Sequence, residues 1–549
     1  MDKFTSFLLH SNYKARYFSL FYGMNRTEML TRVREHEKIW DFVIIGGGAT
    51  GIGCAVDAAS RGFDVLLLEQ NDFGKGTSSR STKLVHGGVR YLAQGNVSLV
   101  RESLHERGIL SQNAPHLVRK QAFVVPVYSY WDKFFYGAGL KTYNILSGKY
   151  GFGKSEILSV EETIKLLPNV KKQDLYGGIL YYDGQFDDTR LLINLAQTAA
   201  EQGAVLLNYA RVFSFHRNDE DGNIDGAAVS DELTGQVFLA QAKVVINATG
   251  AFCDAVRKFS DRNAENIIAP SQGIHLVFDR KFLPTENALM VPKTSDERVL
   301  FAIPWHDHAV FGTTDTPVEK AELEPQALET EIEFILETAK NYLENPPRRE
   351  DILSVFVGIR PLVKTDNAQN TASLSRDHTI EIDKSNLLTI TGGKWTTYRR
   401  MAEDAINQAA KLGGLPEKKC VTENLKIHGA VETNDTRNDL NIYGTDAEEI
   451  NKLIAEKPYL AEKLHEDLPY RKAEIVWAVR NEMAETIEDI LARRTRALFL
   501  NAKAAIEIAP QIAEILAEES NKESAEVWIQ EQIQIFGETA RHYLVKSCD

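Results

Sequence analysis

The chain has 549 residues, which is too long for a single hydrophobic core and predicts two or three structural units. Its 43% hydrophobic and 26% charged residues are typical of a folded globular protein, and its net charge of -14 argues against non-specific binding to nucleic acid. Its four cysteines lie far apart, so we predict neither a metal site nor a disulfide framework. No apolar run of about 20 residues occurs, so no membrane-spanning helix is expected.

Residues 1–39 are interpreted as an N-terminal extension. Residues 1–23 contain a single acidic residue, Asp2, among basic and aromatic ones, as in a transit peptide. The alternative is that these residues are an upstream over-extension and that Met24 is the true start, and we favour this second interpretation.

Residues 40–70 have the pattern of a β-α-β unit. An apolar run at 40–46 predicts a buried parallel strand, residues 51–61 a short helix, and residues 64–70 a second buried strand. The unit is about 30 residues long, which is the size of a mononucleotide-binding half.

The first turn of this unit matches G-x-G-x-x-G. Gly46 permits the tight turn, Gly48 lets the backbone approach a pyrophosphate, and Gly51 lets the helix pack closely on the strand. Glu69 ends the second strand, where a carboxylate can accept hydrogen bonds from a ribose. Together these features predict a dinucleotide site, although a glycine-rich turn alone would be weak evidence.

The later elements alternate between strands and helices up to about residue 412. We predict a polar loop at 71–88, helices near 96–110 and 187–202, strands at 176–183, 243–250 and 386–392, a hairpin turn at 221–223, strands and turns over 299–316, and a long helix from Lys394. From about residue 420 glycine becomes rare and helical spacing dominates. One predicted helix face carries Ile475, Val479, Met483, Ile487 and Ile490.

Two later segments favour FAD over NAD as the dinucleotide. Residues 244–250, which include Thr249 and Gly250, resemble the strand and turn that lie against the nucleotide in FAD-dependent oxidases and dehydrogenases. Gly392 and Gly393 open a helix whose N-terminus can stabilise negative charge on a reduced flavin. The alternative for these two glycines is an ordinary strand-to-helix turn.

Several longer blocks resemble the FAD-dependent, aerobic and quinone-linked glycerol-3-phosphate dehydrogenase family. They are GTSSRSTKLVHGGVRYL (76–92), YYDGQFDD (181–188), GTTDT (312–316), GIRP (358–361), SRD (375–377) and GGKWTTYR (392–399), in family order. The resemblance implies oxidation of sn-glycerol 3-phosphate to dihydroxyacetone phosphate, with FAD as the hydride acceptor.

The resemblance also implies the fold. We expect an α/β FAD-binding, Rossmann-like domain of the glutathione-reductase and D-amino-acid-oxidase type, an antiparallel-sheet cap, and a C-terminal all-helical domain. The oxidoreductase region would span 40–412, with FAD-binding parts at about 40–95, 185–260 and 355–412 and cap parts at about 96–184 and 261–354. The helical domain would cover 420–549.

Site residues follow from the same motifs. For the cofactor we add Thr77, Ser78, Ser79, Lys83, His86 and Gly88 to the glycines, Glu69 and Thr249 named above. Substrate phosphate requires fixed cations, and the resemblance favours Arg360 and Arg376 for this role. Arg90 with Tyr91 would hold the phosphate or the glycerol hydroxyls, and Lys394 would contact the substrate or neutralise the reduced flavin. His86 is the first candidate for the base, with His275 and His378 as alternatives, and Arg90 and Lys394 are the other catalytic candidates. The plainer interpretation is that His86 only hydrogen-bonds the flavin or backbone.

The electron acceptor implied by the resemblance is a membrane quinone. Aromatic and lysine residues interleave over 130–150, as in a helix lying among lipid headgroups, and the alternative is a buried cap helix. We therefore expect a cytoplasmic protein bound peripherally to the inner membrane, with homodimer formation left open. Competing functions are a glycerol-3-phosphate oxidase that releases peroxide, an FAD-dependent amine or amino-acid oxidase, and a non-catalytic flavoprotein.

Overall fold

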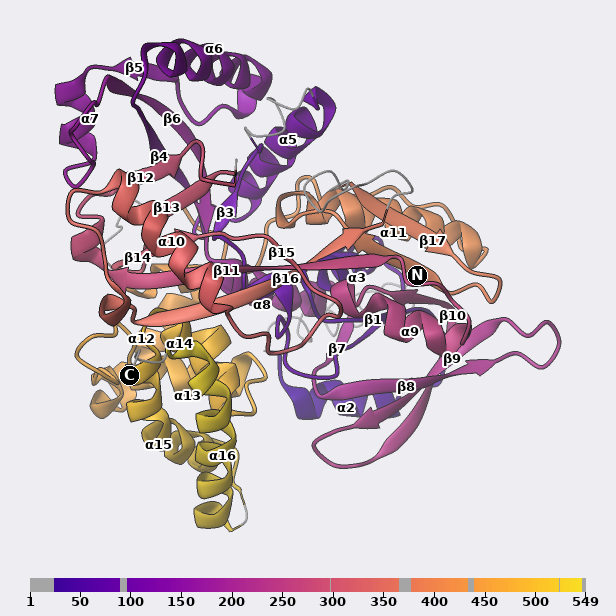
Figure 1. The fold of residues 1–549 in the computed structure, drawn as a ribbon. Helices are drawn as coiled ribbons and strands as arrows, with labels where there is room; N and C mark the ends of the chain where they lie inside the picture. Colours follow the sequence, from indigo (N-terminus) through magenta and orange to yellow (C-terminus); the bar gives the residue numbers. More distant parts are fainter. Residues whose placement is uncertain are drawn as a thin grey trace, which may run out of the picture.

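The computed structural model describes residues 24–88, 96–296, 298–364, 377–432, 439–522 and 524–545. Two large sheets lie next to each other, and a group of C-terminal helices packs below the second of them (Figure 1). The first sheet has eight strands and the second has ten.

The centre of the first sheet is parallel, in the order β18-β10-β1-β2-β7. These strands are β1 (Trp40–Ile45), β2 (Val65–Leu68), β7 (Val205–Leu207), β10 (Val237–Asn247) and β18 (Leu388–Gly392). The residues that pair at the centre of this sheet are buried, as expected of a parallel sheet covered by helices. The remaining strands are antiparallel additions: β8 (Ala210–Arg217), β9 (Ile224–Asp231) and β17 (His378–Ile382).

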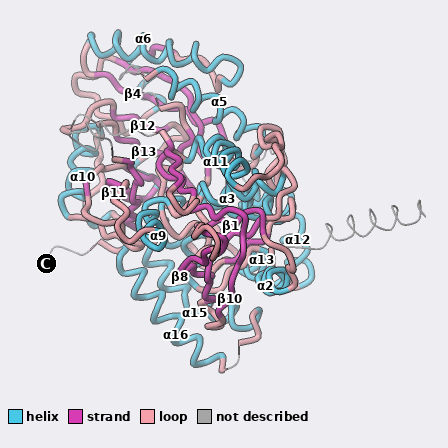
Figure 2. Tube along the Cα trace, turned by 90° about the vertical axis from the view of Figure 1, so that its right-hand side faces the viewer, coloured by secondary structure: helices cyan, strands magenta, loops and turns pink. Residues whose placement is uncertain are grey.

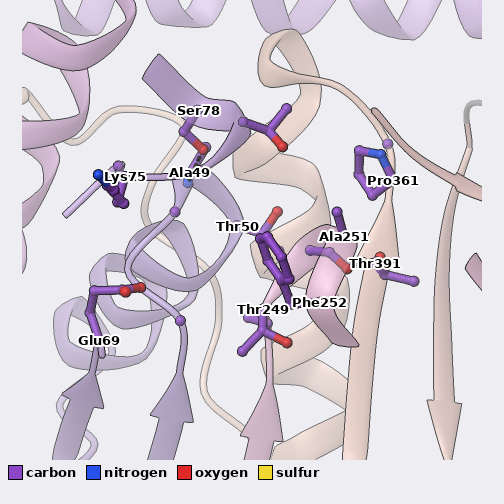
Figure 3. A pocket seen from close by; sticks show the side chains of 18 of the residues that line it. Ala49, Thr50, Glu69, Lys75, Ser78, Thr249, Ala251, Phe252, Pro361 and Thr391 are labelled. Atoms are coloured by element: carbon purple, nitrogen blue, oxygen red, sulfur yellow. Dashed lines mark hydrogen bonds between the residues drawn. The ribbon is translucent and has the colours of Figure 1, made fainter. Parts of the chain in front are cut away.

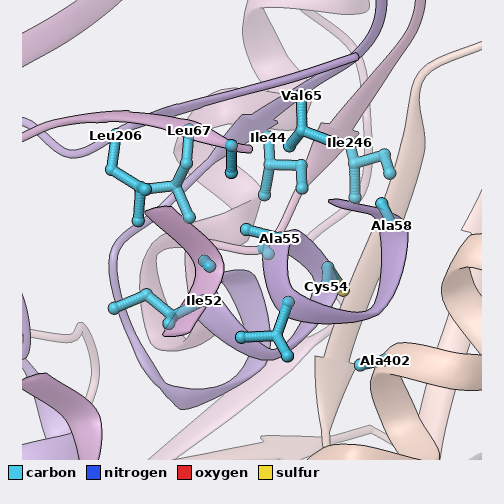
Figure 4. Packing of buried hydrophobic residues seen from close by; sticks show 14 of the residues in the cluster. Ile44, Ile52, Cys54, Ala55, Ala58, Val65, Leu67, Leu206, Ile246 and Ala402 are labelled. Atoms are coloured by element: carbon cyan, nitrogen blue, oxygen red, sulfur yellow. The ribbon is translucent and has the colours of Figure 1, made fainter. Parts of the chain in front are cut away.

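Helix α3 (Ala49–Ser60) packs between this sheet and two further helices, α8 (Asp188–Glu201) and α11 (Tyr398–Leu412). Ile52, Cys54 and Ala55 of α3 are buried in one cluster with the strand residue Ile44 and with Ala402 of α11 (Figure 4). Cys54 is free and fully buried, as expected of a small packing residue.

The second sheet is antiparallel except where β4 and β12 run parallel. Its strands are β3 (Leu84–Val85), β4 (Val118–Val127), β5 (Glu156–Leu158), β6 (Gly177–Phe186), β11 (Ile268–Asp279), β12 (Ala288–Val291), β13 (Leu300–Trp305), β14 (His308–Gly312), β15 (Thr316–Pro317) and β16 (Ser354–Val363). The helices of this region are α5 (Val97–Asn113), α6 (Tyr130–Ser147), α7 (Val160–Leu166) and α10 (Glu329–Tyr342). Figures 1 and 2 both place α6 along the outer edge of the region formed by the second sheet and these helices.

The chain crosses between the two sheets more than once. Strand β3 follows the loop after β2 and pairs with β6, and β6 leads directly into α8 under the first sheet. These crossings bring residues 82–88 to the boundary between the sheets.

The C-terminal region contains α12 (Ala447–Glu456), α13 (Lys472–Asn481), α14 (Ala497–Leu500), α15 (Ala502–Glu519) and α16 (Ala525–Ala540). The single helix face predicted over 475–490 is wrong. Helix α13 ends at Asn481, and Met483 has a φ of 56°. The carbonyl of Glu482 accepts a hydrogen bond from Arg494 at 2.7 Å, so buried polar contacts take the place of the continuing helix. The apolar residues beyond the break are nevertheless buried, as the pattern predicted.

A half-buried histidine near the start of this region should make stability depend on pH. His428 lies 2.5 Å from Glu201 and 2.8 Å from Asp446, and these hydrogen bonds outweigh burial and raise its pKa to about 10. Its contribution is fully present below pH 6.5, where the unfolded histidine is also protonated, and is lost as pH rises towards 10. Each pKa unit is worth about 1.4 kcal/mol.

We therefore expect His428→Gln to be destabilised by a few kcal/mol at pH 6 and to approach the parent at pH 9, measured by urea unfolding at both pH values. His216→Gln is the matched control, because the His216 side chain is 46% exposed. An equal effect of His428→Gln at both pH values would contradict the assignment.

Candidate active site

The glycine-rich turn joins β1 to α3. Gly48 is the N-cap of α3, so the first N–H groups of the helix face the end of the sheet. A Cβ on Gly51 would lie 1.9 Å from the carbonyl oxygen of Gly46, so only glycine allows this approach of helix to strand. The turn therefore has the shape that a bound pyrophosphate requires.

The loop after β2 is tied to this turn. Glu69 accepts hydrogen bonds from the Gly47 amide at 2.7 Å and the Asn71 amide at 2.8 Å. Burial raises the pKa of Glu69, although these two amides oppose it. The Ser78 hydroxyl accepts a hydrogen bond from the Ala49 amide at 3.0 Å.

The segment after β18 closes the opposite side. The indole of Trp395 donates to the Ser78 carbonyl at 2.8 Å, which links residues 391–396 to the loop after β2. The Thr391 hydroxyl donates to the Gly250 carbonyl at 3.1 Å and joins the same segment to the turn after β10.

These three segments enclose a cavity of about 610 Å³, a volume suited to a large cofactor (Figure 3). Figure 3 shows Glu69 on one wall and Thr249, Thr391 and Pro361 on the other. The predicted cofactor and substrate residues that line it are Gly46, Gly48, Glu69, Thr77, Ser78, His86, Thr249, Gly250, Arg360, Gly392, Gly393 and Lys394.

A second cavity of about 160 Å³ adjoins the first, and the two share Thr82, Leu84, His86 and Arg360 in their walls. Gly88 lines the second cavity. A small molecule in this second cavity would lie directly against whatever occupies the adjoining end of the larger one. That arrangement suits a reaction between a cofactor and a small substrate.

One wall of the second cavity holds two arginines around one carboxylate. Arg360, on β16, donates to the Thr314 carbonyl at 2.8 Å and lies 3.4 Å from Asp315 Oδ1. Arg298 donates to the Asp315 carbonyl at 2.6 Å and lies 3.1 Å from Asp315 Oδ2. Each arginine side chain is 20% exposed, so both groups are held in place and yet reach the cavity.

Three of the predicted cofactor residues lie away from the cavity lining. Gly51 acts in helix packing, Ser79 is buried, and Lys83 is fully buried. The Lys83 ammonium donates to Asp188 at 2.7 Å and to the Ser79 carbonyl at 2.8 Å, and burial lowers its pKa to about 7 although Asp188 opposes this. Arg90, Tyr91 and Arg376 lie outside the described residues.

The three histidine candidates have different settings. His86 lines both cavities, and its amide donates to the Thr396 hydroxyl at 3.2 Å. His275 lies behind Thr82, with a ring nitrogen 2.9 Å from that hydroxyl, and burial with Lys83 and Arg360 nearby lowers its pKa well below the usual value. His378 pairs with Asp404 at 3.2 Å and lines neither cavity.

The sequence reasoning did not select several lining residues. Asp183 and Asp315 belong to the quoted blocks 181–188 and 312–316, so a signal existed, whereas Arg298 stands in no quoted motif. Trp395 likewise lies inside a quoted block.

This fold and site define an oxidoreductase class that binds a dinucleotide at the carboxyl end of a parallel sheet. A model described as "FAD dependent oxidoreductase" matches residues 41–399, and one described as "C-terminal domain of alpha-glycerophosphate oxidase" matches residues 386–527. The chain is 40% identical to the mitochondrial glycerol-3-phosphate dehydrogenase SDP6 of Arabidopsis thaliana over 521 residues, covering 87% of this chain and 82% of the relative. It is 40% identical to the human mitochondrial glycerol-3-phosphate dehydrogenase over 538 residues, covering 92% and 73%.

Among solved structures, the glycerol-3-phosphate dehydrogenase of Bacillus halodurans complexed with FAD has a TM-score of 0.77 and 27% identity, covering 96% of this chain and all of that one. The chain belongs to the FAD-dependent glycerol-3-phosphate dehydrogenase family. The predicted cofactor, FAD, and the predicted FAD-binding α/β fold with a C-terminal helical domain are thereby confirmed.

Proposed function

We propose that the protein oxidises sn-glycerol 3-phosphate to dihydroxyacetone phosphate. Bound FAD supplies a two-electron acceptor for the hydride that leaves substrate C2. The observation that carries the proposal is the wall shared by the two cavities, in which His86 and Arg360 face both. The small cavity would hold the substrate and the large one the cofactor.

Phosphate binding is assigned to the arginine wall of the small cavity. Arg360 has the planar fork that pairs with two phosphate oxygens, and the neighbouring carbonyls already fix its direction. Arg298 adds a second cation beside it. We propose further contributions from Arg90, Tyr91 and Arg376, and from Lys394, which lines the large cavity.

The 2-hydroxyl must lose a proton as the hydride leaves. His86 remains our first candidate for the base because it lines both cavities. Burial, with Lys83 and Arg360 nearby, lowers the pKa of His275 well below its usual value, which makes it a weak base, and Thr82 stands between it and the cavities.

Anaerobic titration of the FAD-loaded protein tests the proposed function. We expect sn-glycerol 3-phosphate to bleach the flavin absorbance, whereas D- and L-amino acids and simple amines leave it unchanged. A flavin that stays oxidised would refute the proposal.

The glycerol-3-phosphate oxidase alternative is favoured by one finding, the match of residues 386–527 to an oxidase C-terminal domain. We expect quinone analogues to reoxidise the bleached flavin faster than oxygen does. Peroxide formed in step with substrate consumption would favour the oxidase instead.

We propose that α6 holds the protein against the cytoplasmic face of a membrane, where a quinone accepts the electrons. Trp131, Phe135 and Ile145 recur along one side of α6 and are 81%, 67% and 79% exposed, whereas Leu140 and Tyr143 on the other side are buried. Lys141 and Lys149 are exposed near the same helix, as suits anionic lipid headgroups. In the part of the chain that the structure describes, no helix is long and apolar enough to cross a bilayer.

Replacing Trp131 and Phe135 together with glutamate should release the protein from anionic phospholipid vesicles by more than about tenfold while FAD stays bound, because charged groups on this face oppose insertion. Co-sedimentation with phosphatidylglycerol vesicles measures it. Val527→Glu, on α16 and also well exposed, is the control and should bind like the parent. Equal sedimentation of the double variant would count against α6 as the docking surface.

A further inference from the structure

A buried tyrosine reaches from α6 to the loop that carries His86. Tyr143 is 1% exposed, and its hydroxyl oxygen accepts a hydrogen bond from the Gly87 amide at 2.8 Å. The same hydroxyl donates to Asp183 Oδ2 at 2.5 Å. Asp183, on β6, lines the small cavity together with His86 and Gly88. These contacts form a chain of hydrogen bonds from the carboxylate in the cavity wall to the backbone next to His86.

The direction of each hydrogen bond in this chain is fixed. Burial and the neighbouring Asp183 raise the pKa of Tyr143 well above its usual value, so its hydroxyl keeps the proton that it donates to the carboxylate. Arg107 donates to the other oxygen of Asp183 at 2.7 Å and to the Tyr150 carbonyl at 2.7 Å. The carboxylate is therefore anchored from two sides and cannot turn away from the tyrosine without leaving a buried charge unpaired.

The loop also fits the tyrosine by shape. A Cβ on Gly87 would lie 2.4 Å from the Tyr143 hydroxyl and 2.6 Å from a Leu104 methyl, so only glycine permits this contact. Just before Gly87 the backbone has other supports, since Val85 pairs with Gly184 of β6 and the His86 amide donates to the Thr396 hydroxyl. At Gly87 itself, the backbone amide donates to the Tyr143 hydroxyl.

We infer that Tyr143, held by Asp183, is a positioning residue that sets the backbone of residues 86–88 and so the approach of His86 to the substrate. This inference rests on the proposed function. Tyr143 and Arg107 line neither cavity, so we assign neither of them a direct contact with the substrate. Removing the tyrosine hydroxyl should leave the cofactor cavity intact and disturb the chemical step.

Tyr143→Phe in the FAD-loaded protein tests this with two measurements. Anaerobic stopped-flow reduction by sn-glycerol 3-phosphate should be about 10- to 100-fold slower at saturating substrate, because small misplacements of a catalytic group have effects of this size, while FAD content stays at the parent level. Amide hydrogen exchange should be faster in peptides that contain Gly87. Tyr128→Phe is the matched control, since its hydroxyl donates to the Lys171 carbonyl at 3.0 Å away from both cavities.

Unchanged hydrogen exchange around Gly87, or an unchanged reduction rate in the FAD-replete variant, would overturn the inference. If the parent protein itself is not reduced by sn-glycerol 3-phosphate, the proposed function fails, and the exchange measurement still decides whether Tyr143 holds the loop. Flavin reduction in a double variant, Tyr143→Phe with Asp183→Asn, should be no slower than in the slower single variant, because both changes break the same chain of hydrogen bonds.

Discussion

Arg360→Gln is expected to lower kcat/KM for sn-glycerol 3-phosphate by about 10²- to 10³-fold. The arginine lines both cavities, and its guanidinium direction is set by the Thr314 and Gln272 carbonyls. Losing one charge-assisted partner of a largely desolvated phosphate costs about 2–5 kcal/mol, and each 1.4 kcal/mol corresponds to about tenfold. Steady-state kinetics with an artificial electron acceptor measures the change.

Two comparison variants make this expectation specific to phosphate recognition. Arg360→Lys keeps the charge and loses the planar fork, so its kcat/KM should lie between the parent and Arg360→Gln. Arg348→Gln removes an arginine whose side chain is 81% exposed and should match the parent. Full FAD occupancy in each variant separates substrate binding from cofactor loss. An Arg360→Gln enzyme within twofold of the parent would remove Arg360 from the phosphate site.

The sequence predicts those parts of the site that local patterns specify. A buried strand, a glycine turn and a helix follow one another over residues 40–61, so short-range geometry already places Gly46 and Gly48 at the dinucleotide. The segment at 391–394 was found for the same reason, since a strand ends there and a helical turn follows.

Other parts depend on contacts between distant segments, which no local pattern reveals. Arg298 reaches the site because β13 and β14 pair beside β11, and Asp315 then fixes it beside Arg360. Lys83 lies among the serines and threonines of the loop after β2, so the sequence alone predicts that it binds the cofactor. Its ammonium instead points to Asp188, within reach of three aromatic rings.

The break after α13 has the same kind of cause. The helical spacing of apolar residues continues through Met483. However, the Asn208 side chain donates to the Met483 carbonyl at 2.8 Å, and Arg494 donates to the Glu482 carbonyl. Polar partners more than ten residues away therefore overrode the local helical pattern.

Buried ion pairs connect the loop after β2 to the C-terminal region. Asp72, at the start of the loop, is fully buried and receives hydrogen bonds from Arg493 and from both terminal nitrogens of Arg494, at 2.7 and 2.9 Å. Burial alone would raise the pKa of Asp72, yet the two arginines hold it below its usual value. Further along the loop, the Ser79 carbonyl accepts from Arg496 at 2.6 Å. The C-terminal helices thus fix the backbone that faces the cofactor.

Asp72→Ala should therefore lower the free energy of unfolding by about 3–5 kcal/mol, because it leaves two buried guanidinium groups without their shared carboxylate. The milder Asp72→Asn keeps the shape of the side chain, so this variant should still fold. It should bind FAD more weakly than the parent, because the loop after β2 must then be ordered as the cofactor binds. Urea unfolding and fluorescence titration of the apoprotein with FAD measure the two effects. Glu449→Ala is the control, since its pair with Lys452 lies at the surface and should contribute less than about 1 kcal/mol. If Asp72→Asn binds FAD as tightly as the Glu449→Ala control, the ion pairs stabilise the fold without shaping the cofactor site.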